Sequence, residues 1–266
     1  MALLEESSFD PTTPEAAAER RVERRWWGDH LAEMRWQAEL ARLLVDPVYH
    51  GRGVPRGDGS PVVTIPGFLA GDQSLSVMRG WLRRIGYRPH ASGINFNVDC
   101  SDRAVERLDA LVERLHERSG RPVALVGHSR GGHFAKALAR RRPDRIAAVI
   151  SMGAGLDTPF DVSLPTKAGI AAFRALHAHT SDRIAKRGCF TDTCTCRFAR
   201  DYAAEFPASV PLTSLYSRGD GVVWWEACVV PYARNVEVTG SHVGLAFNRK
   251  AYAEIAQALA ASSEVG

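Results

Sequence analysis

One short segment constrains the fold of this chain more than any other. Residues 125–134, LVGHSRGGHF, place a serine among glycines. The apolar run 122–126 before the serine is long enough for a buried strand and too short for a helix. Residues 133–142 favour a helix, which Pro143 ends. Because glycine tolerates backbone conformations that a Cβ forbids, the segment predicts a strand, a tight turn at Ser129 and a helix.

The turn has the spelling of a nucleophile elbow. Gly127-His128-Ser129-Arg130-Gly131 matches G-x-S-x-G between a strand and a helix. In an elbow the turn exposes the serine hydroxyl, and the N-terminus of the following helix favours negative charge beside it. The alternative is a glycine-rich turn without chemistry, since the pattern also arises by chance. The rest of the sequence is needed to distinguish a nucleophile elbow from a turn without chemistry.

Length and composition favour one large α/β domain. The chain has 266 residues, of which 45% are apolar, enough for a full core. Four of its 34 basic residues are lysines and the other 30 are arginines, spread along the whole chain. A net charge of +4 without a basic patch argues against nucleic-acid binding.

The N-terminus and the hydropathy favour a cytoplasmic protein. No apolar stretch reaches the roughly 18 residues that a membrane span needs. Glu5 and Glu6 stand where a secretory signal would be basic. A trimmed leader remains open.

Strand and helix patterns alternate along most of the chain. This alternation predicts a mostly parallel sheet with helices on both faces. The expected strands are 62–65, 87–91, 122–126, 146–151, 211–216 and 236–238, and the expected helices include 74–84, one beginning near 101, 133–142 and 249–260.

We expect residues 1–50 to form an N-terminal extension and residues 51–266 to form the α/β domain. We expect a tail over 1–14 and an amphipathic helix over 15–45, ended by Asp46-Pro47. The helix carries one apolar stripe, composed of Trp27, Leu31, Met34, Ala38, Ala41 and Val45. We expect this stripe to pack on its own domain. A homodimer contact or a membrane-surface contact is the alternative.

Between residues 152 and 206 the alternation lapses. An irregular insertion of this length usually has a task such as covering a site, so we predict a lid or cap. It includes a helix pattern with Ile170, Phe173 and Leu176 and then the sequence CFTDTCTC, which contains Cys189, Cys194 and Cys196.

The cysteines leave three readings open. An odd total of five argues against a fully paired framework. A local disulfide among Cys189, Cys194 and Cys196 and a set of free thiols fit about equally well. A zinc site with His177 and His179 fits less well, because C-x4-C-x-C is not a usual ligand spacing.

A serine nucleophile needs a histidine to take its proton and a carboxylate to stabilise the histidine. The segment SLYSRGDGVV ends a strand in a loop with Asp220, and VEVTGSHVGLAF ends the next strand in a loop with His242. Both loops follow strands at the same predicted sheet edge as Ser129. We predict Ser129, Asp220 and His242 as a catalytic triad, with Asp157 as the rival acid. His128 should point away from the serine hydroxyl.

Acyl transfer also needs donors for an oxyanion. The segment TIPGFLAGD turns after the first core strand, so the amides of Phe68 and Arg130 can face the site together. We expect Asp72 to be a helix N-cap. The apolar residues near the site predict a pocket for an acyl chain; they are Leu69, Val222, Val223, Trp224 and Trp225.

Four blocks resemble the small bacterial lipases and carboxylesterases of the α/β-hydrolase superfamily. They are PGF, GHSRGG, LTSLYSRGDGVV and ARNVEVTGSHVGLAFN, spread over about half of the chain. The resemblance implies the α/β-hydrolase fold, with Ser129 as nucleophile, Asp220 as acid, His242 as base and the amides of Phe68 and Arg130 as oxyanion donors. The chain departs from the family in its N-terminal helix, in its insertion and at Pro66, where the family often has histidine.

The function that follows is hydrolysis of apolar acyl esters, with a small-molecule ester or a lipid-like substrate. An acyltransferase or thioesterase using the same three residues is the alternative. A binding protein without catalysis is the remaining reading. No motif predicts a metal or a cofactor.

Overall fold

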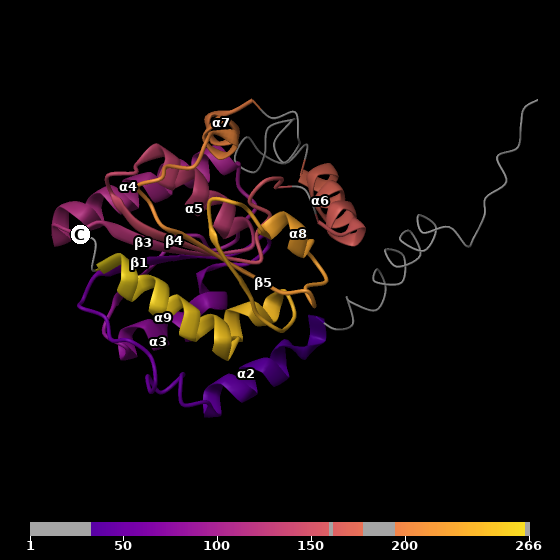
Figure 1. Ribbon diagram of the computed structural model, residues 1–266. Helices are drawn as coiled ribbons and strands as arrows, with labels where there is room; N and C mark the ends of the chain where they lie inside the picture. The colour runs from indigo at the N-terminus through magenta and orange to yellow at the C-terminus, as the bar shows by residue number, and fades with distance from the viewer. Residues whose placement is uncertain (1–32, 160–161, 178–194, 264–266) are drawn as a thin grey trace, which may run out of the picture.

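A six-stranded parallel sheet forms the centre of the protein (Figure 1). The computed structural model describes residues 33–159, 162–177 and 195–263. Strand order across the sheet is β2-β1-β3-β4-β5-β6, and every neighbouring pair is parallel. The strands are β1 Pro61–Ile65, β2 Arg88–Ala91, β3 Val123–His128, β4 Ile146–Met152, β5 Leu212–Tyr216 and β6 Arg234–Glu237.

Burial follows the position of each strand in the sheet. All residues of β1 and β3 are buried, whereas β2 and β6 at the edges are largely exposed or half-buried. Runs that are apolar on both faces are what a parallel sheet covered by helices requires. The expected mostly parallel α/β fold is confirmed.

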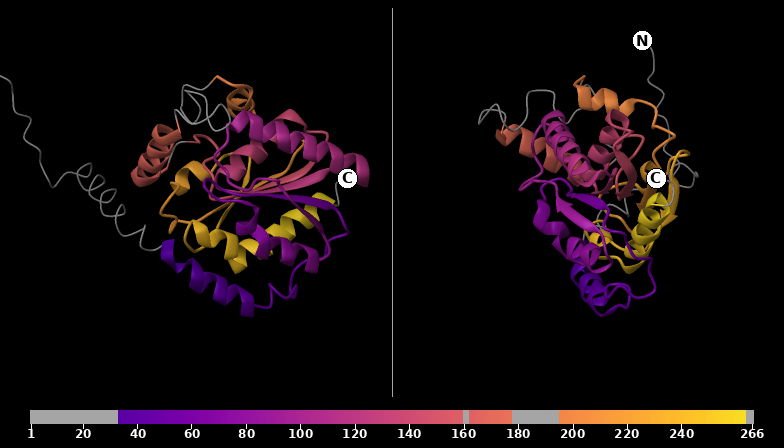
Figure 2. Two further views of the ribbon diagram at one scale, coloured as in Figure 1. Left: turned by 180° about the vertical axis from the view of Figure 1, so that it is seen from behind. Right: turned by 90° about the vertical axis from the view of Figure 1, so that its left-hand side faces the viewer.

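Helices cover both faces of the sheet (Figures 1 and 2). On one face, Phe134 and Leu138 pack with Val63 and Leu125 of the sheet. On the other face, Trp81 packs with Tyr252 at a ring-centroid distance of 4.5 Å. The first face carries α4 Ser101–Ser119 and α5 Arg130–Arg141; the second carries α3 Ser76–Arg84, preceded by the short helix η2 Asp72–Leu75, and α9 Arg249–Ser263.

The N-terminal helix packs with a different face from the one predicted. Its described part is η1 Glu33–Arg35 followed by α2 Trp36–Val45. Met34 is 68% exposed and Val45 80% exposed, while Leu43 is buried. The inward face carries Leu43 together with Glu33 and Glu39, whose carboxylates bond to loops of the core, so the predicted apolar stripe is not the face that packs on the domain. Trp27, Leu31 and the expected start of the helix lie outside the described residues.

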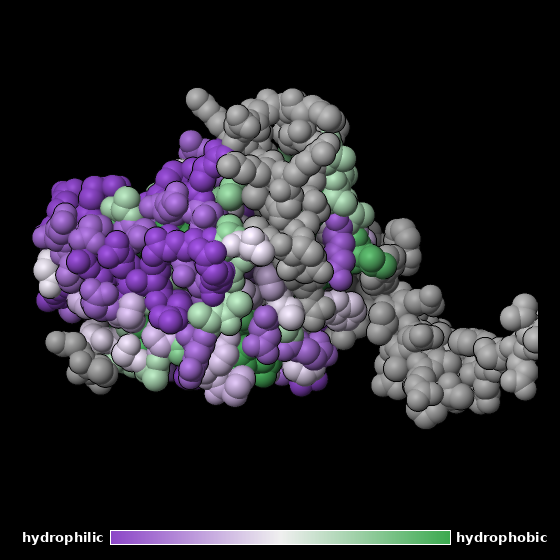
Figure 3. All heavy atoms as spheres, turned by 90° about the horizontal axis from the view of Figure 1, so that it is seen from above, coloured by the Kyte–Doolittle hydropathy of each residue, from purple (hydrophilic) through white to green (hydrophobic). Residues whose placement is uncertain are grey.

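The insertion contains two α-helices that differ in how they pack, α6 Leu164–His177 and α7 Arg197–Ala203. Helix α7 packs on α5: Phe198 contacts Phe134 at 5.7 Å between ring centroids, and Asp201 pairs with Arg141 at 2.7 Å. It therefore extends the core. Helix α6 lies apart from α7, and near it green, apolar side chains reach the surface, whereas the surface over α4 is strongly hydrophilic (Figure 3).

Within the described ranges, no helix combines the length and the hydropathy needed to cross a membrane.

Candidate active site

The turn between β3 and α5 holds Ser129 in a strained backbone conformation. Its φ of 52° and ψ of −126° lie in a region that side chains with a Cβ rarely adopt. The amide of Ser129 donates to the carbonyl of Met152 at 2.8 Å, which fixes the turn against β4. A Cβ at Gly131 would lie 2.1 Å from the carbonyl oxygen of Ile65, so only glycine allows the turn to approach β1 this closely.

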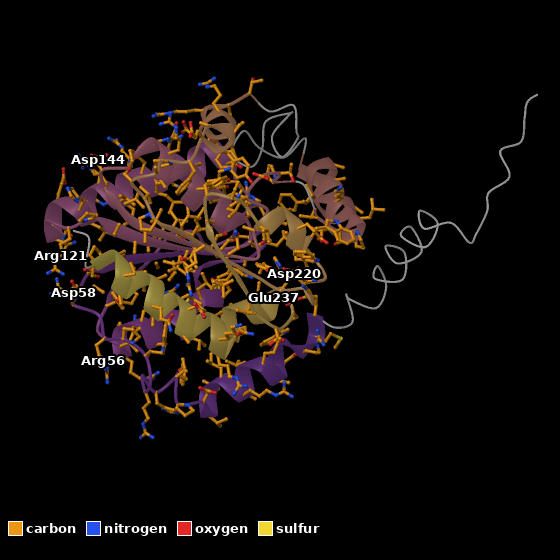
Figure 4. All side chains as sticks on the ribbon, viewed as in Figure 1. Arg56, Asp58, Arg121, Asp144, Asp220 and Glu237 are labelled. Atoms are coloured by element: carbon orange, nitrogen blue, oxygen red, sulfur yellow. The ribbon has the colours of Figure 1, made fainter. Side chains whose placement is uncertain are left out.

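Asp220 and His242 form a buried pair after β5 and β6. Asp220 Oδ2 and His242 Nδ1 are 2.7 Å apart, and the two side chains are 2% and 7% exposed. The other carboxylate oxygen, Oδ1, accepts the amides of Val222 and Val223, both at 2.8 Å. Figure 4 labels Asp220 at the side of the molecule where α6 and α8 Trp225–Cys228 lie.

The electrostatic surroundings of His242 favour its charged form. Burial lowers the pKa of this histidine, but the charge of Asp220, its hydrogen bond and the charge of Glu33 raise it, and the net direction is upward. An imidazole with such a carboxylate partner accepts a proton readily and keeps one ring orientation.

Contacts join the ends of β3 and β4 to this pair. His128, next to Ser129, donates from Nε2 to the backbone carbonyl of His242 at 2.8 Å, and the two rings lie 4.9 Å apart. Burial and then the charge of His242 lower the pKa of His128 to about 4, so this ring is neutral and can act as a donor. Gly153, directly after β4, also lies against the pair, because a Cβ at this position would lie 3.1 Å from both Asp220 Oδ2 and His242 Nδ1.

The loop after β1 passes directly beside Ser129. A Cβ on Gly67 would lie 3.0 Å from the Ser129 Cβ, so the segment that contains the Phe68 amide borders the serine. Leu69 has a φ of 59°; within the described ranges it and Ser129 are the non-glycine residues with positive φ. Strain of this kind persists only where the surrounding structure enforces it.

Asn97 and Arg130 fix that loop. Asn97 Nδ2 donates to the Pro66 carbonyl at 2.8 Å, and the Asn97 amide donates to the Ala70 carbonyl at 2.8 Å. The buried guanidinium of Arg130 donates to Asn97 Oδ1 at 2.8 Å and to the Asp99 carbonyl at 2.7 Å. The side chain of Arg130 thus joins the serine turn to the loop that contains Phe68.

Comparison with known proteins identifies the architecture. A family model described as alpha/beta hydrolase fold matches residues 83–176, which include the Ser129 turn. The chain has the α/β-hydrolase fold. It resembles small bacterial lipases and esterases of that superfamily.

Solved structures of similar architecture share little sequence with this α/β-hydrolase-fold chain. A lipase from Bacillus licheniformis is 15% identical with a TM-score of 0.55, covering 78% of this chain and 94% of its own. A monoglyceride lipase from Saccharomyces cerevisiae is 14% identical with a TM-score of 0.56, covering 79% and 90%. A carboxylesterase structure from the thaumarchaeon Nitrososphaera gargenis is 15% identical with a TM-score of 0.55, covering 79% and 94%.

The residues predicted to line a pocket lie in several places. Val222 and Val223 adjoin Asp220, and Val223 forms an antiparallel bridge with Val162 at the base of the insertion. Trp224 is half-buried and Leu69 is exposed. Trp225 stacks on Tyr216 at 5.7 Å between centroids, so it packs beside β5. A common acyl pocket stays a prediction.

Two further expectations about side chains have definite outcomes. Asp72 is not an N-cap: its carboxylate accepts the amides of Ser92 and Gly93 at 2.9 and 2.8 Å and so joins η2 to the turn after β2. The rival acid Asp157 is exposed, whereas Asp220 contacts His242.

The cysteine prediction falls largely on residues that are not described. Cys189 and Cys194 lie outside the described residues, and Cys196 lies at the N-terminus of α7. Among the described residues, no group of three or more histidine, cysteine or acidic side chains could hold a metal ion.

Four residues that support the site were not predicted from the sequence, namely Glu33, Glu39, Asn97 and the ring of His128. The position of His128 next to Ser129 was visible, but not its bond to the His242 carbonyl. The two glutamates lie 188 to 210 positions along the chain from the residues whose amides they accept. No sequence motif links these glutamates to the residues that they contact.

Proposed function

We propose that the protein is a serine ester hydrolase that cleaves apolar acyl esters through an acyl-enzyme on Ser129. The observation that carries the proposal is the buried Asp220–His242 pair, 2.7 Å apart, at the same sheet edge as the strained turn of Ser129. A nucleophile, a base and an oriented carboxylate are the three groups that this chemistry requires.

In the first half of the reaction, Ser129 Oγ attacks the ester carbonyl carbon while His242 Nε2 takes the hydroxyl proton. Asp220 stabilises the imidazolium through Nδ1. The amides of Phe68 and Arg130 donate to the developing oxyanion. His242 then protonates the leaving alcohol. In the second half, water loses a proton to His242 and attacks the acyl carbon. The bond from that carbon to Ser129 Oγ then breaks as His242 returns the proton to Oγ, which releases the acid.

The apolar surroundings of the serine support acyl chains as substrates. Phe173 of α6 contacts Phe68 at 6.0 Å and Phe96 at 6.5 Å between ring centroids. Leu69, Phe96 and Leu164 are about half exposed, at 46%, 52% and 55%. Such a group of apolar side chains can remove an acyl chain from water. In this proposal α6 acts as the lid of the site.

A series of p-nitrophenyl esters, from acetate to laurate, tests the proposal. We expect hydrolysis by the purified protein, with kcat/KM higher for a medium or long chain than for acetate. Ser129→Ala should lower kcat by at least about a thousandfold, because it removes the nucleophile and leaves only binding and the oxyanion donors. Near wild-type turnover by the Ser129→Ala protein would rule the proposal out.

A further inference from the structure

The N-terminal extension reaches the loops of the proposed triad through Glu33. One carboxylate oxygen, Oε1, accepts the amide of Gly221 at 3.0 Å and the amide of His242 at 2.8 Å. The other oxygen, Oε2, accepts the amide of Val243 at 3.0 Å. A single side chain from outside the sheet therefore ties the loop of Asp220 to the loop of His242.

Glu39, two turns further along, binds the residue before His242. Its Oε1 accepts the Ser241 amide at 3.0 Å, and its Oε2 accepts the Ser241 hydroxyl at 2.8 Å. The same hydroxyl accepts the Gly244 amide at 3.1 Å. Hydrogen bonds to a carboxylate are stronger than those between neutral groups, so these contacts add to the bonds that fix the loop of His242.

The glycines around His242 make room for the Glu39 carboxylate. A Cβ on Gly244 would lie 1.4 Å from Glu39 Oε2, and a Cβ on Gly240 would lie 2.9 Å from Oε1. Gly244 belongs to η3 Val243–Phe247 and does not have a positive φ, so backbone conformation does not explain its presence. The close approach of Glu39 does.

We propose that Glu33 and Glu39 are positioning residues, which set the place of His242 relative to Asp220 through backbone amides. The inference rests on the proposed ester hydrolysis, because it assigns His242 the role of base. It assigns the N-terminal extension a part in catalysis: α2 and η1 complete the site by fixing the two loops that follow β5 and β6.

The charges around His242 make the inference measurable. Its ring meets Asp220 from the loop after β5 and the neutral His128 from β3. Glu33 from η1 adds negative charge near the ring. Glu39 is hydrogen-bonded to Ser241, the residue before His242, and Arg35 lies near Gly219 in the loop of Asp220. Glu33→Gln removes one negative charge and should lower the pKa of His242.

The first test compares Glu33→Gln with Glu106→Gln, the same chemical change at an exposed position of α4. With a short, soluble p-nitrophenyl ester, we expect Glu33→Gln to lower kcat at least about tenfold with KM nearly unchanged. The acidic limb, where kcat/KM falls at low pH as His242 is protonated, should move to lower pH by roughly half a unit. This is less than the pKa shift of about 1–3 units that is typical of a direct ion pair. Glu106→Gln should change neither quantity.

The second test uses Gly244→Ala, which forces the Glu39 carboxylate out of its place. We expect Gly244→Ala and Glu39→Ala each to lower kcat, and the double variant to cost little more than either, because both remove the same contact. Multiplicative losses would contradict a shared effect. Thermal unfolding of every variant shows whether it is folded at the assay temperature.

The outcomes separate this inference from the proposed function. If Ser129→Ala remains active, the proposed function fails. If turnover depends on Ser129 but Glu33→Gln and Glu39→Ala change only the melting temperature, with kcat and the acidic limb unchanged, the glutamates serve folding alone and the inference is overturned.

Discussion

Asp220 differs from Asp157, the rival acid, in that Asp220 is buried against His242 and both of its carboxylate oxygens are hydrogen-bonded. Its two oxygens accept the amides of Val222 and Val223 and contact His242 Nδ1. Such bonds fix both the orientation of the carboxylate and the tautomer of the imidazole. Asp157, which the sequence left as a rival, is exposed after β4 and lies near Lys136.

We therefore expect Asp220→Asn and Asp157→Asn to have very different effects. Asp220→Asn should lower kcat by roughly a thousandfold or more, because an amide can stabilise the wrong imidazole tautomer and cannot stabilise the imidazolium. Asp157→Asn should retain most activity. Steady-state kinetics on one ester decides between them. A mild Asp220→Asn together with a severe Asp157→Asn would place the acid after β4.

At the scale of elements, the sequence predicted what depends on local patterns. Strands β1, β3, β4 and β5 are short runs that are mostly apolar, and glycine spacing located the turn at Ser129, so their placement followed from residues a few positions apart. Short helices such as α8 and η3 carry too few residues for a periodic pattern, and they were not anticipated.

Contacts between distant elements could not be predicted in the same way. The inward face of α2 carries Glu39 beside the apolar Trp36 and Leu43, and the Glu39 carboxylate accepts the amide and hydroxyl of Ser241. Every residue except proline has a backbone amide, so an acceptor for such amides leaves no signature near its partner. The same reasoning applies to Asn97, which binds the Pro66 carbonyl.

At the scale of the whole molecule, two histidines buried on α5 and β3 link stability to pH. Burial, together with the charges of Arg130 and Lys136, lowers the pKa of His133 to about 3. Burial and the charge of His242 lower that of His128 to about 4. Both rings are neutral in the folded protein at pH 5, where an unfolded histidine is charged, so the unfolded chain binds more protons.

We expect the free energy of unfolding to fall as the pH drops from about 6.5 toward 4, by about 1.4 kcal/mol per pH unit for each of these histidines. Urea titrations at several pH values measure this slope. His133→Phe, which keeps a ring against Tyr202, should make the slope shallower by about one histidine's share. The exposed His50→Gln is the control and should leave it unchanged. Equal slopes for His133→Phe and the wild type would contradict the account.

The central claim is that Ser129 is a nucleophile activated by His242, and covalent trapping tests it most directly. A fluorophosphonate reacts with an activated serine hydroxyl and leaves a stable adduct, which tandem mass spectrometry of the digested protein locates. We predict one adduct on the peptide that contains Ser129, absent from Ser129→Ala and formed far more slowly by His242→Ala. An unlabelled Ser129 in active protein, or an adduct on another serine, would contradict the account.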